Sequence, residues 1–90
     1  MAAIWQFPCH ARMDIRRLVG DNVRAYRLRA GLSQEELAAR MEVEQGYVSR
    51  LEAGSRNPTI VTISQAADAL GVTPAALFEK KQPGAKRSKS

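Results

Sequence analysis

The chain has 90 residues, which is enough for one small domain but not for two. Its hydrophobic fraction of 44% and charged fraction of 26% are ordinary for a soluble globular protein, and it has no apolar run long enough to cross a membrane. It contains one cysteine, Cys9, and one histidine, His10, so an intramolecular disulfide or a Cys/His zinc site cannot form within the chain. Residues 1–8 lack the basic leader and long apolar core of a secretory signal. We therefore expect a cytoplasmic protein without a metal or cofactor.

The excess positive charge gathers at the end of the chain. Lysine and arginine number 14 against 9 acidic residues, a net charge of +5. From Lys80 onward the chain has basic residues and no acid, which leaves residues 1–79 neutral. A basic protein suggests nucleic acid or an anionic surface as partner, but a neutral body means that charge alone does not decide. We predict a disordered basic tail over residues 80–90, because residues 82–90 lack large apolar side chains.

The N-terminal segment and the body differ in pattern. Residues 1–13 lack hydrophobic periodicity, which predicts an irregular arm whose Trp5 and Phe7 pack on the body or on a partner. Residues 14–79 show helical spacing and no alternating strand pattern. The domain is therefore predicted to be all-α, a compact five-helix bundle.

Capping residues place the first two helices. Asp14 caps the first helix, and Gly31 ends it as a left-handed cap. Ser33 and Glu36 form a capping box at the start of the second helix, in which each side chain accepts from the backbone N–H of the other residue. A short turn at residues 42–43 then leads to a third helix, at about residues 44–53, which Gly54 ends.

Two further helices follow. Thr59 caps the fourth helix and Gly71 ends it. Its inward residues are predicted to be Ile60, Ile63, Ala66, Ala67 and Leu70. Thr73 caps the fifth helix and Pro74 takes its first position, where a missing amide hydrogen costs nothing.

The second and third helices are short and lie about three residues apart, which is typical of a helix-turn-helix. The second helix of such a pair can enter a major groove. With Val48 turned inward, helical periodicity turns a set of small and polar residues outward or to the flanks: Gln45, Gly46, Tyr47, Ser49 and Arg50. Arginine pairs with guanine and glutamine with adenine, so this set is predicted to read bases. An ordinary solvated helix face is the alternative.

Three segments carry a family resemblance. Residues 31–38 read Gly-Leu-Ser-Gln-Glu-Glu-Leu-Ala, residues 47–59 read Tyr-Val-Ser-Arg-Leu-Glu-Ala-Gly-Ser-Arg-Asn-Pro-Thr, and residues 69–72 read Ala-Leu-Gly-Val. In this order and spacing they closely resemble the Xre/Cro-like helix-turn-helix regulators of phage-repressor type, over roughly residues 15–79. The resemblance implies a five-helix domain that binds double-stranded DNA as a homodimer on a two-fold-symmetric operator. The length also resembles the controller proteins of restriction–modification systems.

The resemblance also implies roles for residues around the motif. Gln34 matches a glutamine that touches phosphate and often braces a recognition-helix glutamine, here Gln45. Arg56 and Asn57 look like further phosphate contacts, although Asn57 is equally expected only to shape the turn before Pro58.

The resemblance implies a structural ion pair as well, and the sequence departs from the family in two places. Arg27 and Glu52 match an Arg–Glu pair that joins the first and third helices. Glu42 stands in the turn where the family commonly has glycine, and a non-glycine residue in a left-handed conformation costs about 1 kcal/mol. Glu44 replaces the usual Ser, Thr or Asp cap. Both changes predict modest intrinsic affinity for DNA.

A dimer surface is expected near the end of the body, where Leu77 and Phe78 are joined by Val61. An antitoxin or anti-repressor, a protein-interaction module with secondary DNA binding, is the alternative function, with Trp5, Phe7, Leu77 and Phe78 as its surface. RNA binding ranks lower because the chain lacks aromatic platforms for unpaired bases. No catalytic constellation is evident, so we expect neither an enzyme nor a small-molecule ligand.

Overall fold

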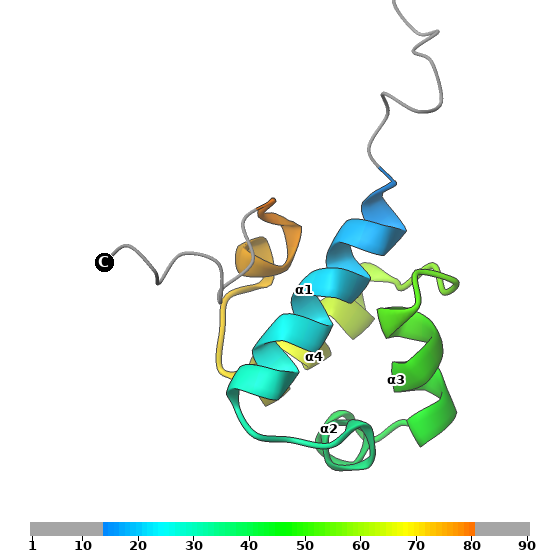
Figure 1. Ribbon diagram of the computed structural model, residues 1–90, viewed down its shortest axis with the longest axis vertical. Coiled ribbons are helices and arrows are strands. Elements are labelled where there is room, and N and C mark those ends of the chain that lie inside the picture. The colour runs from blue at the N-terminus through cyan, green and yellow to red at the C-terminus, as the bar shows by residue number, and fades with distance from the viewer. Residues whose placement is uncertain (1–13, 81–90) are drawn as a thin grey trace, which may run out of the picture.

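The structure, a computed structural model, describes residues 14–80. These residues form four α-helices and one short 3-10 helix, joined by short connections (Figure 1). The elements are α1 (Ile15–Arg29), α2 (Gln34–Met41), α3 (Gln45–Glu52), α4 (Ile60–Leu70) and the 3-10 helix η3 (Pro74–Phe78). Because no strand occurs within these residues, the all-α prediction is confirmed for them. The predicted arm, with Trp5, Phe7, Cys9 and His10, and the tail beyond Lys80 lie outside the described residues.

The fifth predicted helix is a 3-10 helix and not an α-helix, so the structure has four α-helices in the described residues. The segment after Thr73 is a 3-10 helix of 5 residues, ended by Glu79 in an extended conformation. Thr73 caps it as predicted, accepting from the backbone N–H of Ala76 at 3.3 Å, and Pro74 stands at its start. A segment this short does not complete two α-turns, and the tighter 3-10 form is common in such short pieces.

The predicted helix ends follow from local hydrogen bonds. The capping box is complete: the N–H of Glu36 donates to Ser33 Oγ at 3.0 Å, and the N–H of Ser33 donates to Glu36 Oε1 at 2.7 Å. The predicted glycine stops all have positive φ angles, namely Gly31 (75°), Gly54 (79°) and Gly71 (74°).

The turn between α2 and α3 uses the conformation that glycine favours although it has no glycine. Glu42 has φ 62° and ψ 42°, the left-handed region. The N–H of Val43 then donates to the carbonyl of Ala38 at 2.9 Å, which closes the end of α2. Glu42 therefore adopts the strained geometry that the sequence predicted, and the hydrogen bond after it helps to hold that geometry.

The core lies where α1, α2, α3, α4 and η3 meet. Its buried residues are Val19, Val23, Leu37, Ala38, Met41, Val48, Leu51, Ala66, Ala67 and Leu77. The prediction that Ile60 points inward is wrong, because its side chain is 85% exposed. Side chains on a helix lean toward its N-terminus. Ile60 is the first residue of α4, so it leans past the end of the helix and away from the core.

Helix α1 is the central element and contacts α3, α4 and η3. Figure 1 shows α1 running between α3 on one side and the C-terminal 3-10 helix on the other. The α1–α3 approach is close at Gly20, where an added Cβ would overlap the carbonyl oxygen of Leu51 and lie 2.9 Å from that of Glu52. Glycine at this position therefore lets α3 lie directly against α1.

Asn22 fastens η3 to α1. Its side chain is fully buried, and its Nδ2 donates to the carbonyl oxygens of Leu77 at 2.8 Å and of Glu79 at 2.7 Å. Leu77 is also fully buried. A buried apolar side chain and two hydrogen bonds thus hold the end of the domain, and each hydrogen bond is worth about 1 kcal/mol net.

Candidate nucleic-acid interface

Helix α3 presents a polar face outward from a firmly packed base. Val48 and Leu51 are buried and fix the helix on the core. Among the residues predicted to read bases, Gln45, Ser49 and Arg50 are exposed, and Gly46 and Tyr47 are half-buried. The structure therefore brings an amide, a hydroxyl and a guanidinium onto one accessible face. These are the groups that pair with base edges.

Lack of space within the domain does not explain why residue 46 is a glycine. A Cβ placed there would meet only the guanidinium of Arg50, with its closest atom, Nη1, at 3.2 Å. That group is the far end of a flexible exposed side chain and can move away. Crowding inside the described domain thus does not account for the glycine.

A buried ion pair joins α1 to α3. Arg27 Nε donates to Glu52 Oε2 at 2.6 Å and Arg27 Nη2 donates to Glu52 Oε1 at 3.1 Å, with the two side chains only 9% and 4% exposed. Arg27 Nη1 donates to the carbonyl oxygen of Leu32 at 2.8 Å, in the connection between α1 and α2. One guanidinium therefore links three segments, and this two-point geometry is the strong form of an arginine–carboxylate pair.

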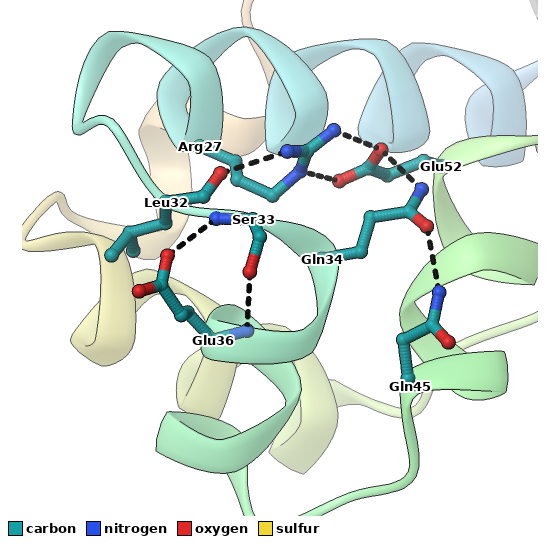
Figure 2. Close-up of polar contacts among 7 residues, drawn as sticks. All are labelled: Arg27, Leu32, Ser33, Gln34, Glu36, Gln45 and Glu52. Carbon is teal, nitrogen blue, oxygen red and sulfur yellow. Dashed lines mark hydrogen bonds and ion pairs between the residues drawn. The ribbon is translucent and has the colours of Figure 1, made fainter.

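The ion pair continues into a chain of glutamines that reaches the outward face of α3 (Figure 2). Gln34 Nε2 donates to Glu52 Oε1 at 3.1 Å, and Gln45 Nε2 donates to Gln34 Oε1 at 3.0 Å. The contact between Gln34 and Gln45 is the one that the family resemblance implied. A continuous polar path thus runs from buried Arg27 to exposed Gln45.

The loop after α3 carries the other predicted phosphate contacts. The guanidinium of Arg56 lies over the ring of Tyr47, 4.7 Å from its centroid, and Arg56 is exposed. Tyr47 packs against the core, so a cation–π contact holds Arg56 beside α3. Asn57 is also exposed, and it lines a hollow of about 130 Å³ beside Pro58.

The two acidic departures both lie at the surface. Glu42 and Glu44 are exposed, and Glu44 occupies the N-cap of α3 without a capping hydrogen bond from its side chain. The start of α3 therefore has negative charge beside it but lacks the side-chain acceptor that a Ser, Thr or Asp would supply.

The residues predicted to form a dimer surface separate into two groups. Val61 and Phe78 are 66% and 42% exposed, but Leu77 is 0% exposed. Leu77 belongs to the core of its own chain, so its assignment to a dimer surface is corrected. A side chain that is fully buried in its own domain has no surface to offer a partner.

Two apolar residues that were not predicted to form a dimer surface, Ile15 and Ile60, are exposed as well. Ile15 is 48% exposed, and it lines the hollow beside Asn57 together with Ile63 and Phe78. Ile60, predicted to be inward, is exposed at the start of α4.

Comparison with known proteins gives the family. The helix-turn-helix family HTH_3 matches residues 23–77, a range that holds α2, α3 and α4. The chain belongs to this helix-turn-helix family. The family match covers the polar chain from Arg27 to Glu52 and all the residues predicted to read bases.

Relatives of this helix-turn-helix chain are transcriptional regulators and control proteins. It is 51% identical over 61 residues to the uncharacterized HTH-type transcriptional regulator y4dJ of Sinorhizobium fredii, which covers 68% of this chain and 79% of that protein. It is 39% identical over 67 residues to the control protein C.BamHI of Bacillus amyloliquefaciens, covering 73% and 83%. The crystal structure of the restriction-modification controller protein C.AhdI from Aeromonas hydrophila matches with a TM-score of 0.68 and 38% identity, covering 70% and 96%. The prediction of a DNA-binding helix-turn-helix family of transcriptional regulators is therefore confirmed.

Between residues 14 and 80, no helix is both long and apolar enough to span a membrane. Over the same range, no three or more His, Cys, Asp or Glu residues gather in an arrangement that could hold a metal ion.

Sequence reasoning missed two features that shape the site. Asn22 falls among the apolar positions of the first helix, and an amide on a buried face is a signal for a buried hydrogen bond. The Gln34–Glu52 hydrogen bond had no such signal, because it joins residues 18 apart and depends on the angle between α2 and α3.

Proposed function

We propose that this helix-turn-helix protein is a sequence-specific regulator of transcription that binds double-stranded DNA as a homodimer, with α3 in the major groove of a two-fold-symmetric operator. The observation that carries the proposal is the outward face of α3. There Gln45 and Arg50 are exposed on a helix that is fixed to the core by Val48 and by the Glu52 ion pair. A rigid helix with exposed amide and guanidinium groups is suited to base reading.

The proposed contacts divide into base and phosphate contacts. Gln45, Tyr47, Ser49 and Arg50 face bases, and Gly46 lets the backbone come close. Gln34, Arg56 and Asn57 contact phosphates. Gln34 lies in the first turn of α2, where the N-terminal amides favour an anion, and Arg56 is held beside α3 by Tyr47. Phosphate contacts set the position of the protein on the duplex, and base contacts supply the sequence preference.

The homodimer is supported by the surface and by the size of α3. With only 8 residues, α3 contacts too few base pairs for high specificity, so two copies on adjacent half-sites are needed. Val61 and Phe78, together with Ile15 and Ile60, leave an apolar surface that a second copy would cover.

The similarity to C.BamHI and C.AhdI supports a controller-type role within this class. The cytoplasm is the proposed compartment, since that is where bacterial DNA lies. No small-molecule ligand forms part of the proposal.

Selection of binding sites by the intact protein from a duplex library with a randomised central segment tests this function. We expect enrichment of an inverted repeat whose half-sites lie about 34–36 Å apart, centre to centre. Enrichment of no sequence, together with equal binding to all duplexes, would instead favour the protein-interaction alternative.

A further inference from the structure

The direction of each hydrogen bond in the chain from Glu52 to Gln45 is set by the carboxylate. A carboxylate has no proton to donate, so every partner of Glu52 must present a donor to it. Its partners do so: Arg27 donates through Nε and Nη2, and Gln34 donates through Nε2. The side-chain amide of Gln34 is therefore held with its nitrogen toward Glu52.

This constraint passes on to Gln45. With Gln34 Nε2 turned to Glu52, its Oε1 is left to face α3, and Gln45 must meet that oxygen with a donor. Gln45 Nε2 does donate to it, at 3.0 Å. Figure 2 shows the three side chains in line, from the ion pair to the start of α3. The second N–H and the Oε1 of Gln45 stay available for another partner.

We infer that Glu52 is a positioning residue for DNA reading, because through Gln34 it fixes the order in which Gln45 presents its donor and acceptor to the groove. An amide offers adenine a donor and an acceptor side by side, and a flipped amide offers them in the reverse order. A flip at Gln45 would bring its Oε1 against the Oε1 of Gln34, two acceptors in contact. The inference rests on the proposed function, since it needs Gln45 to face a base.

A variant that tests this inference must let the side-chain amides of Gln34 and Gln45 adopt either orientation. It must do so without leaving a buried charge unpaired. Arg27→Met combined with Glu52→Gln does so, because it replaces both charges at once. The amide at position 52 can then turn either its oxygen or its nitrogen to Gln34, and both orientations of Gln45 become available.

The experiment is site selection from a randomised duplex library with the full chain, the double variant, Gln45→Ala and Arg50→Ala. The two single variants identify which base pair depends on each side chain. We expect the double variant to lose about fivefold or more of the preference at the Gln45 base pair, and to keep the Arg50 base pair within about twofold. Unchanged preference at both base pairs, or equal loss at both, would overturn the inference. Equal loss would mean that Glu52 supports α3 as a whole.

The single variants separate failure of the inference from failure of the proposed function. If Arg50→Ala changes the selected sequence and Gln45→Ala does not, α3 reads DNA but the inference is overturned. If neither variant changes the selected sequence, the inference and the proposed function are both overturned.

A second measurement needs no variant, and so applies even if the double variant fails to fold. Solvent exchange of the side-chain amide protons is measured by NMR in the free protein, with exposed Gln65 as control. We expect one proton each of Gln34 and Gln45 to exchange several times more slowly than those of Gln65. Rates equal to those of Gln65 would contradict the chain of hydrogen bonds and overturn the inference.

Discussion

The guanidinium of Arg27 is removed from water and compensated by three hydrogen bonds, two to Glu52 and one to the carbonyl of Leu32. The pair is almost entirely inaccessible to solvent, so neither charge can recover its hydration if the other is lost. The domain depends on both residues because losing one leaves the other charge buried and unpaired, which costs more than the attraction between the two contributes.

Arg27→Met is therefore expected to lower the free energy of unfolding by about 3–5 kcal/mol, because it leaves the Glu52 carboxylate buried with only Gln34 as a donor. Urea denaturation of the two proteins measures the change. Arg24→Met is the matched control, since Arg24 lies on the same helix with an exposed side chain. A loss no larger than that of the control would show that the pair contributes little.

Gly46→Ala is expected to act in opposite directions on stability and on DNA binding. It should stabilise the domain by about 1 kcal/mol, because alanine is the better helix former and the new Cβ meets only the movable end of Arg50. Affinity for a selected duplex should fall by about 1–3 kcal/mol if DNA comes close to the backbone here. Thermal unfolding and a binding titration check the two effects, and unchanged affinity would rule out the close approach.

For single residues, the sequence predicted the direction of a side chain better than it predicted which residues that side chain contacts. The outward positions of Ser49 and Arg50 follow from the period of a helix once Val48 is turned inward. The stacking of Arg56 on Tyr47 joins a loop to a helix 9 positions earlier, and helical spacing cannot predict the path of a loop.

At the scale of elements, the contact between α1 and α3 determines where the polar face of α3 lies. Gly20 permits this contact, since any side chain would press on the carbonyl groups of Leu51 and Glu52 at the end of α3. Backbone atoms cannot move aside as a flexible side chain can, so a larger residue must push the two helices apart.

Gly20→Ala should therefore destabilise the domain by about 1–3 kcal/mol through overpacking, although alanine is favoured over glycine in a helix by about 1 kcal/mol. Chemical denaturation measures the change, and Gly46→Ala serves as the control with the opposite sign. A Gly20→Ala variant as stable as the parent would mean that α1 and α3 are not in such close contact.

Helix starts and stops were predictable because they depend on a few adjacent residues. The capping box of Ser33 and Glu36 and the positive φ of Gly31 involve neighbours within four positions. The form of η3 and the outward side chain of Ile60 depend on how the ends of elements meet the rest of the fold. Local sequence carries little information on such contacts, so it predicted neither the 3-10 form of η3 nor the exposure of Ile60.

At the scale of the whole molecule, the domain by itself leaves apolar side chains exposed near the starts of α1 and α4 and in η3. These are Ile15, Ile60, Val61 and Phe78. Val61→Glu tests whether a second copy covers them. The change should leave folding intact, because Val61 is 66% exposed and an acidic side chain suits the first turn of a helix, but it should abolish association. Sedimentation velocity at micromolar concentration measures the association state.

Leu28→Glu is the matched control for that experiment. Leu28 is 53% exposed, and it lies about 20 Å along α1 from Ile15. We expect the Leu28 variant to associate like the parent protein. A parent protein that is monomeric, or a Val61 variant that associates normally, would contradict the proposed dimer surface.

The division of contacts between α3, which reads bases, and the loop after it, which contacts phosphates, is the core of the proposed function. Its most direct test compares Arg50→Ala with Arg56→Ala in titrations against a selected duplex and a scrambled duplex at several salt concentrations. Arg50→Ala should cost about 1–3 kcal/mol on the selected duplex and little on the scrambled one. Arg56→Ala should weaken both alike and reduce the salt slope by about one unit for each subunit contact. If Arg50→Ala weakened both duplexes equally, α3 would not be the element that reads the sequence.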